Sequence, residues 1–247
     1  MTRVVALYNI KGGVGKTSAA VNLEWLAAQG GARTLLWDLD PQGAASYLLR
    51  IKPKVKGGAR KLVAGTRDPA SALKGPDHEL LDLLPADFSH RNMDLELAGV
   101  KRPTKGLSRV LSPIASDYEY VFLDCPPQIS LASESVFGAA DVLLVPLIPS
   151  PLSLRTLDQL QTFLAAEVAK PPRVRAFFSM IDGRKRLHRD VIAELTASHP
   201  GVLSSPIPAA SDVERMALHR RVLAQSAPRG TAARAYETLW AELRSEL

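Results

Sequence analysis

The sequence predicts an α/β fold, a doubly wound and mostly parallel sheet with helices on both faces. Three observations predict it. Short apolar runs alternate with amphipathic stretches, a glycine-rich loop follows the first run directly, and acidic residues end two later runs. At 247 residues and 46% hydrophobic content, with no internal repeat or low-complexity linker, the chain can bury one sizeable core. We therefore expect one domain, residues 1–247.

The first segment, residues 3–18 (RVVALYNIKGGVGKTS), predicts a nucleoside triphosphate site. Val4 to Leu7 is expected to be a buried strand and Ser18 to Ala28 the helix that follows. Glycines in the connecting loop let successive N–H groups converge on phosphate oxygens, and a helix N-terminus favours an anion. Lys16 is expected to reach the terminal phosphates, and the Thr17 hydroxyl to bind magnesium.

Acidic residues follow the next expected strand, Arg33 to Trp37, in the sequence DLDPQG. Asp38 and Asp40 would lie at the carboxyl edge of the sheet, where open α/β sheets bind ligands. Asp, Pro and Gly also form turns, so a simple turn is the alternative.

A second acidic strand end, Asp124, follows the expected strand Tyr118 to Leu123 in the sequence DCPP. Four mostly apolar residues and an aspartate are typical of a Walker B segment, whose carboxylate holds magnesium through a water. With Lys16 and Thr17, Asp124 would complete a metal–phosphate site. A helix from Ile129 to Ala140 is expected next.

The remaining expected elements complete an alternation of about seven strands with helices. The further strands are Glu79 to Leu84, Val142 to Ile148, Arg173 to Ile181 and a strand ending at Ile207 and Pro208. The further helices are Arg60 to Ala64, Met93 to Val100, Gly106 to Ala115, Leu152 to Ala169, Asp190 to Ser198 and Thr231 to Leu247. The final helix has an apolar stripe and mixed charges on its other face, which favours a packed core helix.

The formal net charge of +6 favours an anionic partner, either nucleic acid or an anionic membrane surface. Residues 52–61 (KPKVKGGARK) are expected to form a basic surface loop, for which simple solvation is at least as plausible as a binding role. Two further basic clusters stand late in the chain, at Arg184, Lys185, Arg186 and Arg189, and at Arg215, Arg220 and Arg221. Either cluster alone is typical of a solvated face.

The chain is expected to be cytoplasmic. No apolar run reaches the roughly 18 residues needed to span a bilayer, and the N-terminus lacks a signal segment. The single cysteine, Cys125, cannot form an internal disulfide, which fits a reducing compartment.

The motifs KGGVGKTS, DLDPQG and DCPP resemble those of the ParA branch of the ParA/MinD ATPases, which have a deviant Walker A loop. The usual glycine six residues before Lys16 is Ile10 here, and Lys11 stands at the front of the loop instead. The resemblance implies ATP and Mg²⁺ as cofactors, a catalytic set of Lys11, Lys16 and Asp40, and metal binding by Thr17, Asp38 and Asp124. It implies nucleotide binding by Lys11, Gly12, Gly13, Val14, Gly15, Lys16, Thr17, Ser18, Met180, Asp182 and Pro208.

The same resemblance implies a weak ATPase that forms a homodimer around two ATP molecules, with Lys11 reaching the partner's nucleotide. In the ATP state the dimer would bind non-specific nucleoid DNA through the two late arginine clusters. A ParB-like or cargo adaptor protein would stimulate hydrolysis, and the cycle would position a plasmid, a chromosome region or a protein complex. Residues 44–117 diverge most from the family pattern, which favours a cargo other than a plasmid.

Four alternatives share the loop. A MinD-like membrane regulator is opposed by the missing cationic terminal helix. An iron–sulfur reductase resembling the nitrogenase iron protein needs two cysteines per subunit. A tyrosine autokinase should end in a tyrosine cluster, whereas only Tyr236 stands in the tail. The fourth alternative, a nucleotide-gated scaffold with little turnover, is not excluded by the sequence, because the same residues would serve binding and catalysis.

Overall fold

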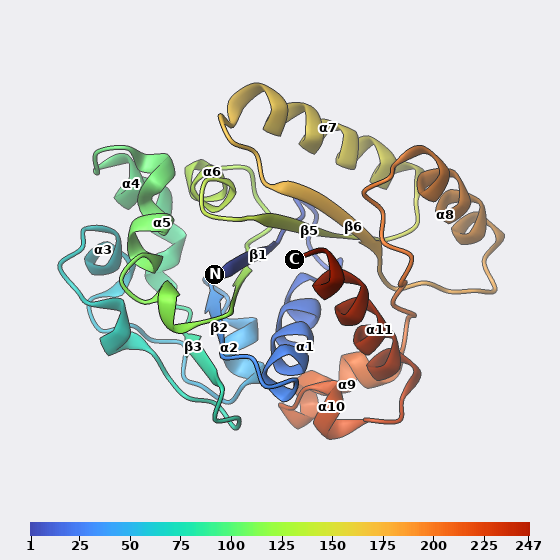
Figure 1. Ribbon diagram of the computed structural model, residues 1–247, viewed down its shortest axis with the longest axis horizontal. Coiled ribbons are helices and arrows are strands. Elements are labelled where there is room, and N and C mark those ends of the chain that lie inside the picture. The colour runs from blue at the N-terminus through green and yellow to red at the C-terminus, as the bar shows by residue number, and fades with distance from the viewer.

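A computed structural model of residues 1–247 contains one six-stranded sheet in the order β3-β2-β4-β1-β5-β6, with every neighbouring pair parallel (Figure 1). The strands are β1 Arg3–Leu7, β2 Thr34–Asp38, β3 Leu81–Leu84, β4 Tyr120–Asp124, β5 Val142–Leu147 and β6 Arg173–Phe178. The predicted fold class is confirmed. The expected seventh strand was wrong, because the segment at Pro208 forms only an isolated bridge with Ile181. The N–H groups of Ile207 and Ala209 do bond to Phe178 O and Ile181 O, but Met180, at a left-handed φ of 57°, interrupts the ladder between these two positions.

Helices connect the strands and cover both faces of the sheet (Figure 1). They are α1 Lys16–Gln29, α2 Ala44–Leu48, α3 Gly58–Val63, α4 Met93–Ala98, α5 Gly106–Leu111, α6 Leu131–Phe137, α7 Pro151–Glu167, α8 Arg186–Ser198, α9 Ser211–His219, α10 Leu223–Ser226 and α11 Thr231–Glu246. Short 3₁₀ turns stand at Pro69–Ala72, Phe88–Asn92, Pro103–Lys105 and Ala115–Asp117. None of the helices is both long enough and apolar enough to cross a membrane.

Several element ends differ from the sequence expectations for identifiable reasons. Helix α5 ends at Leu111 rather than Ala115, because Pro113 cannot continue a helix. Helix α6 begins at Leu131 rather than Ile129, because Ser130 and Ser133 form a capping box at its start. Strand β6 ends at Phe178 rather than Ile181.

Two apolar cores lie on the two faces of the sheet, as the alternation of side chains along each strand requires. One face of β1 packs Ala6 with side chains of α3 to α8. The other packs Val5 and Leu7 with α1, α2 and α9 to α11. With both faces covered, the polar ends of the strands are left as the accessible edge.

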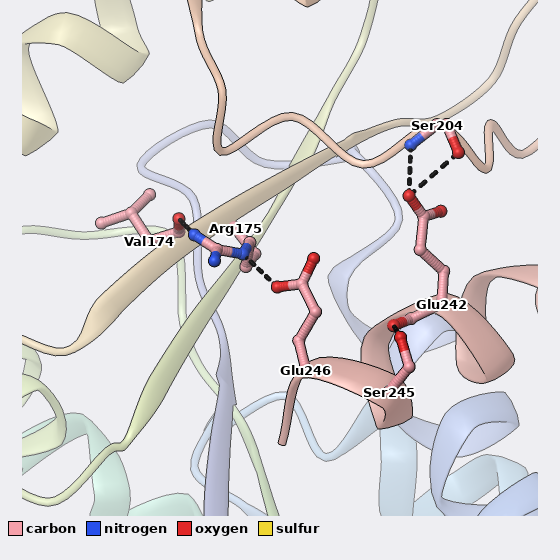
Figure 2. A network of polar contacts seen from close by, with 6 residues as sticks. All are labelled: Val174, Arg175, Ser204, Glu242, Ser245 and Glu246. Carbon is pink, nitrogen blue, oxygen red and sulfur yellow. Dashed lines mark hydrogen bonds and ion pairs between the residues drawn. The ribbon is translucent and has the colours of Figure 1, made fainter.

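Helix α11 is a packed core helix, as expected, with Ala232, Ala233, Tyr236, Leu239, Trp240 and Leu243 buried. Its end is tied to the edge strand by a polar network (Figure 2). Arg175 of β6 pairs with Glu246, and the Glu242 carboxylate accepts bonds from the backbone N–H and hydroxyl of Ser204 at 2.8 and 2.9 Å. These contacts hold the segment after α8 against the C-terminal helix.

One buried group works against stability. Glu24 of α1 is completely buried, and neither carboxyl oxygen has a hydrogen-bond partner. Burial, and secondarily the charge of Asp82, raise its pKa well above the ordinary value of 4.5. Because the folded-state pKa is the higher one, the unfolded chain releases its proton first, and stability is lost as the pH rises above about 4.5.

We therefore expect Glu24→Gln to stabilise the protein by about 1–3 kcal/mol at pH 8 and by clearly less at pH 5. Urea unfolding at the two pH values measures this difference. The exposed residue Glu237 offers a matched control, since Glu237→Gln should change neither curve by more than about 0.5 kcal/mol. Equal stabilisation by Glu24→Gln at both pH values would contradict the assignment of a buried, protonated carboxyl.

Candidate nucleotide-binding site

The glycine-rich loop lies between β1 and α1, at the N-terminus of a 14-residue helix. Gly13 and Gly15 have left-handed φ angles of 70° and 92°, and Gly15 is the N-cap of α1. A Cβ added at Gly15 would lie 2.9 Å from Ser179 Oγ, so a side chain is excluded on two grounds. The loop therefore presents backbone N–H groups to an anion in front of the helix.

Lys16 is buried in this loop, with only 7% of its surface exposed. Its ammonium donates to the carbonyl oxygens of Asn9 and Lys11 at 3.1 and 3.0 Å. Burial lowers its pKa, and the nearby Asp124 carboxylate acts in the opposite direction. The cation is thus held across the loop, where exchanging two carbonyls for phosphate oxygens needs only a small movement.

Asn9 fixes the front of the loop and was not predicted from the sequence. Its Nδ2 donates to Pro146 O of β5 at 2.8 Å, and its Oδ1 accepts the Lys11 N–H at 2.9 Å. The sequence signal that could have found Asn9 is an amide side chain between a buried strand and the glycine-rich loop. In the structure Asn9 is only 3% exposed, so its polar atoms need partners within the chain. The Lys11 side chain itself is half-buried and forms no ion pair in the chain.

Asp38 and Asp124 end neighbouring strands in direct register, and both are completely buried. Asp38 Oδ2 accepts bonds from the backbone N–H and hydroxyl of Ser46, at 2.8 and 2.7 Å. Asp38 Oδ1 and both oxygens of Asp124 have no hydrogen-bond partner. Burial raises the pKa of Asp38 to about 6, and burial together with the Asp38 charge raises that of Asp124.

Orphaned carboxyl oxygens beside a phosphate loop fit a bound cation, because a cation would offset the burial of two acidic groups. The chain has no cluster of three or more His, Cys, Asp or Glu side chains that could hold a metal alone. Magnesium commonly takes one or two carboxylates and completes its shell with waters and phosphate oxygens. The donor set at Thr17, Asp38 and Asp124 therefore fits Mg²⁺ held jointly with a nucleotide.

A cavity of about 540 Å³ opens in front of the loop. Asp40 lines it and is partly exposed, and Asp40 Oδ1 accepts the Gln42 N–H at 2.9 Å, so a local turn holds this carboxylate. The predicted residues that line the cavity are Gly12, Gly13, Gly15, Lys16, Thr17, Ser18, Asp40 and Met180. The lining does not include Lys11, Val14, Asp38 or Asp124, which were also predicted. Pro126, Pro127 and Gln128 join it from the loop after β4.

A second cavity, of about 140 Å³, adjoins Gly15 and Ser18. Met180 and Pro208, which were predicted to contact the nucleotide, both line this cavity, and Met180 is held at a left-handed φ of 57°. Glu214 and Tyr236 also line it and were not predicted. Asp182 lines neither cavity. Bonds from Arg184 hold it and lower its pKa to about 2.

The two late basic clusters are partly engaged within the chain. Arg184 pairs with Asp182, Arg186 pairs with Asp190 at 3.5 Å, and Arg189 donates to Gly183 O at 2.8 Å. Arg220 donates to Tyr47 O at 2.9 Å and lies 4.5 Å from the centre of the Tyr47 ring. Lys185, Arg215 and Arg221 form no ion pair within the chain.

Comparison with known proteins identifies the family. A family model for AAA domains, AAA_31, matches residues 2–171. The chain is 33% identical over 251 residues to the chromosome-partitioning ATPase Soj of Thermus thermophilus. That alignment covers 99% of this chain and 96% of Soj. The chain is also 31% identical over 198 residues to the chromosome partitioning protein ParA of Myxococcus xanthus. That alignment covers 78% of this chain and 70% of ParA.

The fold is also matched by solved structures. A Mycobacterium smegmatis protein described as cobyrinic acid a,c-diamide synthase, with bound ADP and magnesium, superposes with a TM-score of 0.83 at 28% identity, over 100% of this chain and 95% of that one. The domain match covers more than half of the chain and the Soj alignment nearly all of it. The chain therefore belongs to the ParA/Soj family of P-loop ATPases.

Proposed function

We propose that residues 1–247 act as a single magnesium-dependent ATPase unit whose nucleotide state controls dimerisation and DNA binding. The observation that carries the enzymatic part is the buried Lys16 on a phosphate loop, beside two buried aspartates with orphaned oxygens. The family relationship supports ATP as the nucleotide. Magnesium, when bound, would neutralise charge on the β- and γ-phosphates.

Each residue of the site has its own role in the proposed phosphoryl transfer. The N–H groups ahead of α1 and the Lys16 ammonium would hold the β- and γ-phosphates and stabilise charge that develops on the transferred group. Thr17 would bind the metal directly, with Asp124 and Asp38 behind it. Asp40 reaches the cavity from its turn and would orient the attacking water.

Lys11 is assigned to a second subunit's nucleotide. Its backbone is fixed by Asn9, while its side chain is half-buried, carries no ion pair and does not line its own cavity. A cation placed beside the site but outside it suits contact with the phosphates of a facing copy. We therefore propose an ATP-bound homodimer, with Lys11 as a catalytic group in trans.

The likeness to proteins named for chromosome partitioning supports a positioning role. In this proposal the ATP dimer binds non-specific DNA and is located on the nucleoid. A ParB-like or cargo adaptor protein stimulates hydrolysis, and the resulting cycle moves or partitions a cargo.

Phosphate release from ATP, measured with Mg²⁺ and again with EDTA, tests the enzymatic part. We expect turnover that requires Mg²⁺ and stays slow until a partner is added. Tight ATP binding without release under any condition would instead favour the nucleotide-gated scaffold, which shares every binding residue.

A further inference from the structure

Residues 41–67, which begin at the end of the Asp40 turn, form a long stretch of positive charge without an acidic residue. This stretch contains seven Lys or Arg residues and no Asp or Glu, whereas the rest of the chain contains 24 Lys or Arg and 25 Asp or Glu. The whole formal net charge of +6 therefore belongs to about a tenth of the sequence. No role in the nucleotide site accounts for it.

We propose that residues 52–61, here called the basic segment, bind the phosphate backbone of double-stranded DNA. This inference rests on the proposed function and assigns DNA contact to residues other than those of the two late arginine clusters. The cations concerned are Lys52, Lys54, Lys56, Arg60 and Lys61.

The five cations are available for an external anion. Each of their residues is exposed, and none forms an ion pair within the chain. The neighbouring Arg50 differs, since it is already paired with Asp77. Lys52, Lys54 and Lys56 are separated by one residue each, so adjacent ammonium groups spring from Cα atoms at most about 7 Å apart.

The basic segment is held in place rather than loosely attached. Val55 is buried, and its N–H donates to Asp87 Oδ2 at 2.8 Å. Four residues later the Ala59 N–H donates to Ser89 Oγ at 2.8 Å. These bonds anchor the basic segment on the turn after β3, and binding therefore orders mainly side chains, which lowers its entropic cost.

The basic segment also contacts the turn that holds Asp40. A Cβ added at Gly43 would lie 2.9 Å from Pro53 Cβ, and the Gly43 N–H donates to Asp40 O at 2.9 Å. Lys52 and Lys54 flank Pro53, and Pro53 packs against Gly43 in the turn that holds Asp40.

Local charge favours the basic segment over the two late clusters as the main contact. Residues 52–61 carry five cations and no acid, whereas residues 182–190 carry four cations and two acids, Asp182 and Asp190. Residues 211–221 carry three cations and two acids, Asp212 and Glu214. Both acids of the first cluster are paired with its arginines, and this reduces the positive potential there.

DNA suits the basic segment better than a membrane surface does. The large hydrophobic side chains exposed on the molecule include none from residues 52–61. The ring of Phe88, exposed beside the basic segment, has its centre 4.1 Å from the Arg91 guanidinium, so inserting this ring among lipid chains would also bury a charge. Lysines act as point charges that neutralise phosphates without reading bases, which matches sequence-independent binding.

The test compares the affinity for a random-sequence duplex across a salt series, with a non-hydrolysable ATP analogue bound. The variants are K52Q/K54Q/K56Q and a charge-matched control, K101Q/K105Q/K170Q, which removes three exposed lysines elsewhere. We expect the first variant to flatten the slope of log affinity against log salt by about 2.7, and the control to leave it unchanged. The affinity lost between 50 and 200 mM salt should then shrink by about 40-fold.

Unchanged thermal unfolding and ATP affinity would show that the first variant is folded. If that variant keeps the wild-type salt slope while the wild type binds DNA, the inference is overturned and the proposed function stands. If the wild type binds no DNA in any nucleotide state, both fail. An equal flattening of the salt slope in the control variant would show that the effect comes from net charge and not from the position of the three lysines. If K52Q/K54Q/K56Q loses binding to anionic phospholipid vesicles but keeps its DNA binding, the basic segment contacts membranes instead. This result and an equal flattening in the control variant each overturn the inference.

Discussion

Replacing Lys16 with alanine is expected to lower kcat/KM for ATP hydrolysis by about 10³-fold or more. The ammonium is the one cation of this subunit that lies inside its own phosphate loop, held by the Asn9 and Lys11 carbonyls. Its loss removes charge stabilisation in a largely water-excluded position, where electrostatic effects are strong. The measurement is ATP binding by calorimetry together with phosphate release.

The folded state should tolerate this change. Burial already lowers the pKa of Lys16, so the charge costs free energy in the absence of a nucleotide. Unfolding of the nucleotide-free protein should therefore shift by less than about 1 kcal/mol. An exposed lysine, Lys105, provides the control, since Lys105→Ala should leave hydrolysis intact. Hydrolysis by the Lys16 variant within tenfold of wild type would remove this residue from the mechanism.

Replacing Asp40 with asparagine is expected to lower kcat by about 10²–10³-fold while the affinity for ATP changes by less than about threefold. Asparagine keeps an oxygen that can accept the Gln42 N–H, so the turn that holds residue 40 should survive. It loses the negative charge that would orient and polarise water. Single-turnover hydrolysis and equilibrium binding of ATP separate the two quantities.

The control for this change is Asp68→Asn, since Asp68 is exposed and its Oδ1 accepts a local backbone N–H in the same way. A variant at Asp40 with normal kcat would show that water is oriented by another group. A variant with lost ATP affinity would show that Asp40 holds the nucleotide instead.

The arrangement of the sheet and the phosphate loop was predictable because both depend on local patterns. Apolar runs such as Val4 to Leu7 can be buried only as strands or helices, and glycines break the pattern at the turns. That Asp38 and Asp124 lie at one edge of the sheet also follows, since parallel strands end at one edge, but their direct register depends on the strand order, which was not predicted. Proline explains the shorter α5, whereas the left-handed backbone of Met180 explains the missing seventh strand.

The partners of the charged side chains were not predictable, because they lie far away in the sequence. Arg220 rests on Tyr47, 173 positions earlier, and Val55 is anchored by Asp87, 32 positions later. Spacing alone treats all cations in a cluster as equivalent, whereas ion pairs engage some arginines of the late clusters and leave the lysines of the basic segment free. The bonds from Arg184 to Asp182 were likewise not foreseen, and nucleotide binding by Asp182 stays a prediction.

The proposal that nucleotide state controls DNA binding is tested most directly by retention on non-specific double-stranded DNA with ATP, with ADP and without nucleotide, across a salt series. Lys11→Ala is the decisive variant, since Lys11 lies outside its own cavity and is assigned to the partner's nucleotide. We expect retention only with ATP, a steep decline with salt and no retention of the variant. Equal retention in all three states, or a Lys11 variant that behaves like wild type, would contradict the account.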